Sequence, residues 1–85
     1  MITFVFPFAS QPSIEDVSTH DQLIVDVSIT GQETLTHNMN LPVGIVVNVS
    51  AVPTDAGHVY VDSFGDANTL SVNGNGAARL YILRP

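Results

Sequence analysis

The amino-acid sequence predicts an all-β fold, a small antiparallel β-sandwich or jelly-roll-like barrel of six to seven short strands, built as a single domain over residues 1–85. Apolar residues recur with a period of two along most of the chain, which is typical of strands that place one face on a core. Turn-forming residues interrupt these runs at short intervals, in the stretches TGQE, LPVG, PTDAG, FGDAN and NGNG.

The first strand is expected at residues 2–8 and the second at residues 22–30, where Asp26 and Ser28 occupy the polar face. The third is expected at residues 35–41, with hydroxyl and amide side chains on its outer face. The inner faces of these strands are expected to carry Ile2, Phe4, Phe6, Phe8, Leu23, Val25, Val27, Ile29, Leu35, His37, Met39 and Leu41.

Residues 13–21 are the one stretch with a helix signal. Ser13 and Asp16 have the spacing of a partial capping box, in which the two residues satisfy each other's backbone amides. The following residues, Val17, Ser18 and Thr19, continue a helix poorly. A short helix is therefore the less favoured alternative there.

Four more strands are expected at residues 43–52, 58–64, 68–74 and 77–84. The last of them is apolar on both faces, because Tyr81 and Leu83 alternate with the apolar residues at 78, 80 and 82. One small domain cannot easily bury both faces of such a strand. We therefore expect it to lie between its own sheet and another subunit.

Composition limits the classes of partner. The net charge of −6 disfavours nucleic acid and anionic membranes as ligands, and no apolar run approaches the ~20 residues of a membrane-spanning helix. The N-terminal stretch lacks a positively charged region and is expected to be mature structure rather than a signal peptide. Charged residues make up only 12% of the chain, lysine and cysteine are absent, and a domain this small often needs a further source of stability. These features favour a homo-oligomer, such as a trimer.

The candidate interface residues are the N-terminal phenylalanines and the apolar and cationic residues of the last strand, namely Phe4, Phe6, Phe8, Arg79, Tyr81, Leu83 and Arg84. The phenylalanines could dock on a neighbour's sheet edge or fill the protein's own core. The two arginines are the only cations, and each could meet carboxylates of a neighbouring copy. The alternative is that they are solvated or pair with Asp26 or Asp62 across their own sheet.

No enzyme motif is visible, because the chain has no G-x-S-x-G sequence and no cysteine nucleophile, and a thin domain leaves little room for a pocket. The histidines, His20, His37 and His58, lack metal-binding spacing, and His37 is expected to be a hydrogen-bonded core or interface residue. No cofactor is expected. Asp55, Asp62 and Asp66 lie near turns and give a weak calcium signal, for which turn formation is the simpler explanation.

In length, composition and turn spacing the chain is similar to small virion proteins such as the decoration, or cement, proteins of bacterial viruses. That similarity implies a non-enzymatic structural protein that binds between capsid subunits in the virion and often assembles as a trimer. The alternative is a carbohydrate- or receptor-binding β module at the tip of a fibre or tail, with Tyr60 and Tyr81 as the residues that would stack on a sugar. Tryptophan, which such modules often display, is absent.

Overall fold

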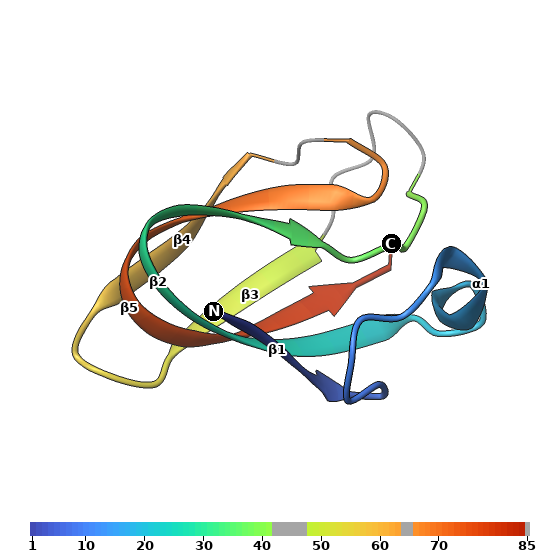
Figure 1. Ribbon diagram of the computed structural model, residues 1–85, viewed down its shortest axis with the longest axis horizontal. Coiled ribbons are helices and arrows are strands. Elements are labelled where there is room, and N and C mark those ends of the chain that lie inside the picture. Colours follow the sequence, from blue (N-terminus) through green and yellow to red (C-terminus); the bar gives the residue numbers. More distant parts are fainter. Residues whose placement is uncertain (42–47, 64–65, 85) are drawn as a thin grey trace.

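The strands form one antiparallel sheet (Figure 1). The structure is a computed structural model that describes residues 1–41, 48–63 and 66–84. Within these residues the elements, in chain order, are β1 (Ile2–Phe6), α1 (Ile14–Val17), β2 (Gln22–Thr36), β3 (Asn48–Pro53), β4 (His58–Ser63) and β5 (Thr69–Leu83). The all-β prediction is confirmed, but the described residues form five strands in one sheet instead of six or seven short ones.

The longest pairing joins β2 to β5. Their register is continuous over fifteen pairs, from Gln22 opposite Leu83 to Thr36 opposite Thr69. The first half of β2 also pairs with β1, and the opposite edge of β5 pairs with β4 in its first half and with β3 in its second half. All these pairings are antiparallel, so β2 and β5 lie between the three shorter strands.

Glycines let β2 and β5 bend without ending. Gly31 has a φ of 90°, and its partner Gly74 has a φ of 132°. Both long strands curve together at one end of the molecule (Figure 1). The turns predicted in TGQE and NGNG are therefore wrong. The strands continue through these stretches because glycine adopts positive φ without a Cβ penalty, and because the partner strand pairs with the residues on both sides of the bend.

The core lies on the inner face of this curled sheet, as the alternation predicts. Val17 of α1 and two residues that follow β2 complete it. The buried hydrophobic residues are Phe4, Val17, Leu23, Val25, Val27, Ile29, Leu35, Met39, Leu41, Val59, Leu70, Val72, Ala78, Leu80 and Ile82.

The expectation that residues 2–8 form one strand with a shared apolar face is only partly correct. Phe4 is buried, but Phe6 is 54% exposed because the register between β1 and β2 shifts between these two residues. Phe8 lies beyond the strand and is half-buried, with its ring edge-on to His20 at a centroid distance of 5.1 Å.

The strand expected at residues 35–41 ends at Thr36. Asn38 and Asn40 have φ values of 58° and 50°, a left-handed conformation that asparagine tolerates and a strand does not use. The alternation of burial nevertheless persists, and His37, Met39 and Leu41 are all buried. Of the strands expected at 43–52 and 58–64, residues 43–47 and 64 lie outside the described residues.

Helix α1 corresponds to the short helix that the sequence left as the less favoured alternative. Both halves of its capping box form, with the Ser13 hydroxyl accepting from the Asp16 amide and the Asp16 carboxylate accepting from the Ser13 amide. The helix ends after one turn at Val17, in agreement with the poor helix propensity of the next residues. Among the described residues, no helix is long and apolar enough to cross a membrane.

Substitution of Gly74 tests whether the bend in β2 and β5 is needed for stability. A Cβ at this position would overlap the main chain of β4 at His58, whereas a Cβ at Gly31 would meet no atom within 4 Å. We expect Gly74→Ala to reduce the free energy of unfolding by about 3 kcal/mol or more. Gly31→Ala should cost only the backbone strain of its positive φ, about 1–2 kcal/mol. Urea denaturation of both variants measures the difference, and equal losses would contradict this account.

Candidate functional site

One sheet face that points away from the core carries a group of exposed and half-buried apolar residues among polar ones. We call it the outer face and define it by Val5, Phe6, Ile24, Val52, Tyr81 and Leu83. Phe6 lies opposite Ile24, and Ile24 lies opposite Tyr81, so three neighbouring strands contribute to one continuous row. The solvent face of an antiparallel sheet usually carries polar side chains. This departure from the usual pattern makes the outer face the main candidate for a contact surface.

An ion pair lies within the outer face. Arg79 donates from Nε to Asp26 Oδ1 at 2.8 Å and from Nη2 to Asp26 Oδ2 at 3.0 Å. The Arg79 hydrogen bonds hold the pKa of Asp26 below its ordinary value, and the Asp26 carboxylate raises the pKa of Arg79. Arg79 thus pairs with Asp26 across its own sheet, one of the two alternatives that the sequence left open.

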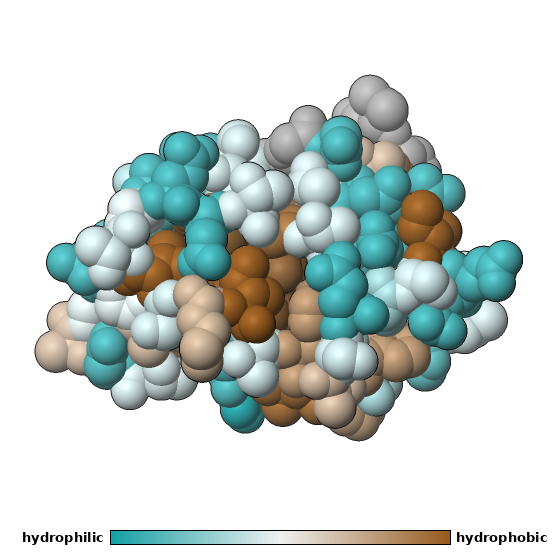
Figure 2. All heavy atoms as spheres, viewed as in Figure 1, coloured by the Kyte–Doolittle hydropathy of each residue, from teal (hydrophilic) through white to brown (hydrophobic). Residues whose placement is uncertain are grey.

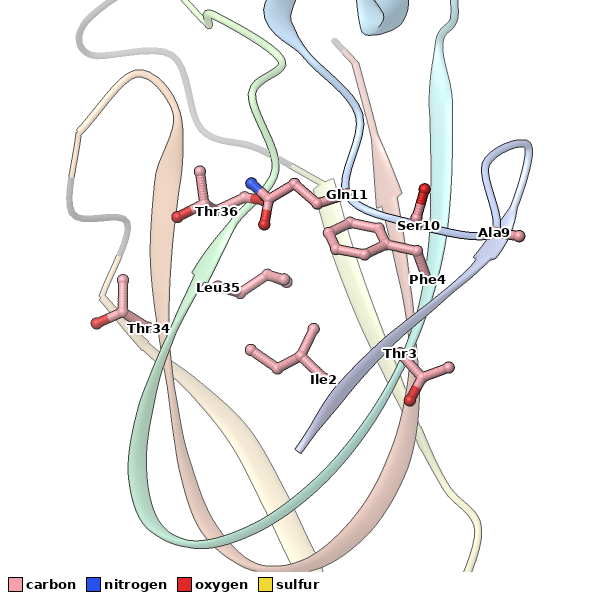
Figure 3. Close-up of a pocket in the computed structure, with 9 residues that line it drawn as sticks. All are labelled: Ile2, Thr3, Phe4, Ala9, Ser10, Gln11, Thr34, Leu35 and Thr36. Atoms are coloured by element: carbon pink, nitrogen blue, oxygen red, sulfur yellow. The ribbon is translucent and has the colours of Figure 1, made fainter.

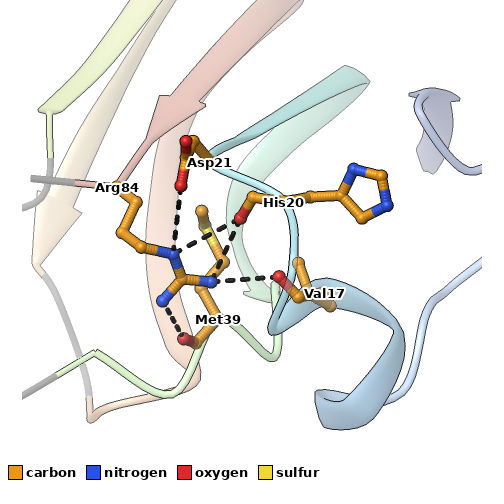
Figure 4. A network of polar contacts seen from close by, with 5 residues as sticks. All are labelled: Val17, His20, Asp21, Met39 and Arg84. Carbon is orange, nitrogen blue, oxygen red and sulfur yellow. Dashed lines mark hydrogen bonds and ion pairs between the residues drawn. The ribbon is translucent and has the colours of Figure 1, made fainter.

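Arg84 makes a different set of contacts (Figure 4). Its guanidinium donates to the carbonyl oxygens of Met39 at 2.8 Å, Val17 at 3.1 Å and His20 at 3.2 Å. Asp21 is more distant, with Oδ1 at 3.9 Å from Nε. Arg84 therefore joins the end of α1, the start of β2 and the segment after β2 to the C-terminal end of β5. These contacts are within the chain, and they satisfy carbonyls that no strand pairing uses.

His37 is the buried histidine that the alternation predicts, with only 1% of its surface exposed. Its Nδ1 accepts a hydrogen bond from the amide of Met39 at 3.0 Å. Burial lowers the pKa of His37 from 6.5 to about 4, while Asp66 opposes the shift and Arg84 adds to it. The neutral ring is therefore a structural part of the core.

The aspartates with a calcium signal act mainly in turns. Asp55 Oδ1 accepts from the Gly57 amide and Oδ2 from the Ala77 amide, and Asp66 Oδ1 accepts from the Asn68 amide. These backbone hydrogen bonds lower the pKa of both carboxyls. Asp62 is exposed on β4, and in the described part of the chain no three histidine or carboxylate side chains gather into a metal-binding group.

The tyrosines proposed as sugar contacts are separated by the bend of β5. Tyr60 of β4 lies opposite Asn73, whereas Tyr81 lies opposite Ser50 of β3. Tyr60 instead has His58 as its aromatic neighbour, at a centroid distance of 5.4 Å. The described residues do not combine the two tyrosines into one platform.

A cleft of about 320 Å³ lies between β1 and the second half of β2 (Figure 3). The residues that line it are Ile2, Thr3, Phe4, Ala9, Ser10, Gln11, Thr34, Leu35 and Thr36. Gln11 spans it, with Nε2 donating to the carbonyl oxygen of Thr36 at 3.2 Å. The sequence analysis missed this cleft, because its two sides are about thirty residues apart and meet only where β2 bends back.

Arg84→Lys is expected to lower the free energy of unfolding by about 1.5–3 kcal/mol. The ammonium group of lysine cannot reproduce the planar guanidinium geometry that donates to three carbonyl oxygens at once. Arg79→Lys is the matched control on the same strand. It should cost less, because the Arg79 and Asp26 side chains are 40% and 39% exposed and water replaces much of their interaction. Chemical denaturation compares the two, and a larger loss for Arg79→Lys would contradict the structural role of Arg84.

The shifted pKa of His37 predicts a loss of stability in acid. Between pH 6.5 and about 4 the unfolded chain binds a proton at His37 that the folded chain does not, so stability falls as the pH is lowered through this range. The slope is at most about 1.4 kcal/mol per pH unit. Asparagine keeps a hydrogen-bond acceptor but does not titrate. The decrease in the free energy of unfolding between pH 7 and 4.5 should therefore be smaller in His37→Asn than in the unmodified chain. Equal falls in the two proteins, measured by urea denaturation, would exclude His37 as the cause.

Comparisons of the chain with known protein families, with curated proteins and with solved structures found no match. Its function is therefore argued from its surfaces.

Proposed function

We propose that this chain is a non-enzymatic assembly protein that uses its outer face to bind other protein subunits. The observation that supports this function is the continuous apolar row across β1, β2 and β5, flanked by Val52 and Leu83, which are 50% and 40% exposed. Burying apolar surface contributes about 25 cal/mol per Å². A specific contact needs about 800 Å² from each partner, out of the 4724 Å² that this chain exposes.

A homo-oligomer is the proposed form. The Asp26–Arg79 pair leaves the outer face locally neutral although the chain carries a net charge of −6. Two copies that meet through this face would bring their apolar rows together. In a two-fold symmetric contact the two Asp26–Arg79 pairs run in opposite directions, so Asp26 of each copy can face Arg79 of the other. In a closed ring such as a trimer, the outer-face residues of one subunit would instead contact a different surface of the next subunit.

The candidate interface residues contribute to this proposal to different degrees. Phe6, Tyr81 and Leu83 belong to the outer face, and Arg79 lies within it. Phe4, Phe8 and Arg84 have partners in the protein's own interior or main chain, so the proposal does not depend on them.

The proposed biological setting is a larger protein assembly, such as a virion in which the chain acts as a capsid decoration protein. We also propose that the curled sheet, whose inner face surrounds one core, corresponds to a small sandwich or jelly-roll-like architecture. Binding of a sugar or receptor at a fibre tip is the alternative, and retention on a glycan column would favour it.

Gel filtration with light scattering tests the proposed assembly. The unmodified chain should elute as a homo-oligomer that dissociates on dilution, and Phe6→Gln combined with Leu83→Gln should elute as a folded monomer. Ile14→Gln is the matched control, because Ile14 is an apolar residue of α1 that is 44% exposed and lies off the outer face. A monomeric unmodified chain at high concentration, or equal dissociation of both variants, would overturn the proposal.

A further inference from the structure

We propose that the cleft between β1 and the second half of β2 binds an extended segment of a partner protein, which adds to the sheet as a further strand. This inference is independent of the outer face, because it rests on unpaired strand edges and not on the apolar row. The cleft has backbone groups on two sides and an apolar floor between them, which are the two requirements for recognition by strand addition.

The edge of β2 that faces the cleft carries main-chain groups without a strand partner. The Ser28 amide donates across this edge to the Met1 carbonyl at 2.9 Å, and the Thr36 carbonyl points to the same edge, where Gln11 reaches it. Backbone groups alternate between the two edges of a strand, so those of Thr34, which lines the cleft, point to this edge as well. Among the described strands, none pairs with this edge beyond the residues opposite β1.

The outer edge of β1 provides the second side. Met1 exchanges hydrogen bonds with Ser28, so two residues further on Thr3 also directs its main-chain groups toward β2. Ile2 and Phe4 must then direct theirs away from β2, toward the cleft. Figure 3 shows that β1 and the second half of β2 run in a similar direction on either side of the cleft. A single segment can therefore be antiparallel to both strands.

Side chains define which segment fits. Ile2, Phe4 and Leu35 form an apolar floor, whereas the side chains of Thr34 and Thr36 point away from it, so these two residues face the cleft with their main chain. Figure 2 shows hydrophobic residues gathered between β1 and the second half of β2, with hydrophilic residues around them. A bound strand of about four residues places alternate side chains on this floor. The segment therefore needs apolar residues at every second position.

Charge identifies the kind of partner. None of the residues that line the cleft is charged, while the chain as a whole carries a net charge of −6. Both arginines are engaged elsewhere, Arg79 with Asp26 and Arg84 with main-chain carbonyls, and the N-terminal ammonium of Met1 is neutralised by Glu33. The surrounding field therefore repels an acidic segment and attracts lysine or arginine at the ends of a bound one. The occupant is a basic-flanked strand of another protein, and a second acidic copy of this chain is disfavoured.

A synthetic peptide tests the site directly. The probe is a fluorescein-labelled peptide with three alternating threonine and valine pairs flanked by two lysines at each end. We expect saturable binding by fluorescence anisotropy with a Kd of about 100 μM or tighter, weakened by added salt. Two control peptides, one with N-methyl groups on alternate amides and one with glutamate in place of lysine, should bind at least about tenfold more weakly.

Two variants of the chain locate the bound peptide. Thr34→Pro removes an amide that points into the cleft, and we expect at least about a tenfold loss of affinity. Thr30→Pro is the matched control, because Thr30 lies on the same edge of β2 but does not line the cleft. Gln11→Ala frees the Thr36 carbonyl for the peptide and should tighten binding, and weaker binding would contradict the inference. Circular dichroism checks that each variant remains folded.

Amide NMR provides a readout that needs no variant. Addition of the lysine-flanked peptide should slow hydrogen exchange at the amides of Ile2, Phe4, Thr34 and Thr36. Absence of saturable binding at about 1 mM peptide would overturn the inference. Equal binding of the N-methylated and unmethylated peptides would also overturn it. The same holds if the peptide slows hydrogen exchange only at residues of the outer face.

Discussion

The register between β2 and β5 is the constraint on which the other pairings depend. Fifteen consecutive pairs hold the two strands together through a shared bend, where Gly31 faces Gly74. A shift of β2 by one residue against β5 would turn Val25 and the other inner residues of β2 from the core to solvent. The bend in turn brings the second half of β2 back toward β1, and the cleft forms between them. The fold and both candidate surfaces therefore follow from one pairing.

The sequence predicted which residues face inward better than it predicted where strands end. A period of two identified Val25 and Val27, and it identified His37 even where the backbone leaves the strand conformation. The sequence predicted turns at Gly31 and Gly74, where the strands instead continue. A glycine beside polar residues has the same local pattern in a turn and in a bent strand. Only the distant partner strand decides between them. The cleft had no local signal for the same reason, since residues about thirty positions apart form its sides.

The two cations have separate effects on the surface. Arg84 donates hydrogen bonds to carbonyls of three segments of the chain, and Arg79 neutralises the charge of Asp26 within the outer face. Association through the outer face would thus rest mainly on the removal of apolar area from water, with little dependence on salt. Association through the cleft would rest on main-chain hydrogen bonds and on the negative field of the whole molecule, and would weaken with salt.

The order of strands in the sheet also affects how the chain can fold. Among the described strands β5 comes last in the sequence, yet it pairs with three of the other four, and more than thirty residues separate it from β2. The entropy of closing that long loop is lost before most sheet contacts form, which slows folding. Among the described strands, β3 and β4 have no partner other than β5. An intermediate in which β5 is not yet paired therefore exposes the apolar residues of β3 and β4, and it is prone to aggregation.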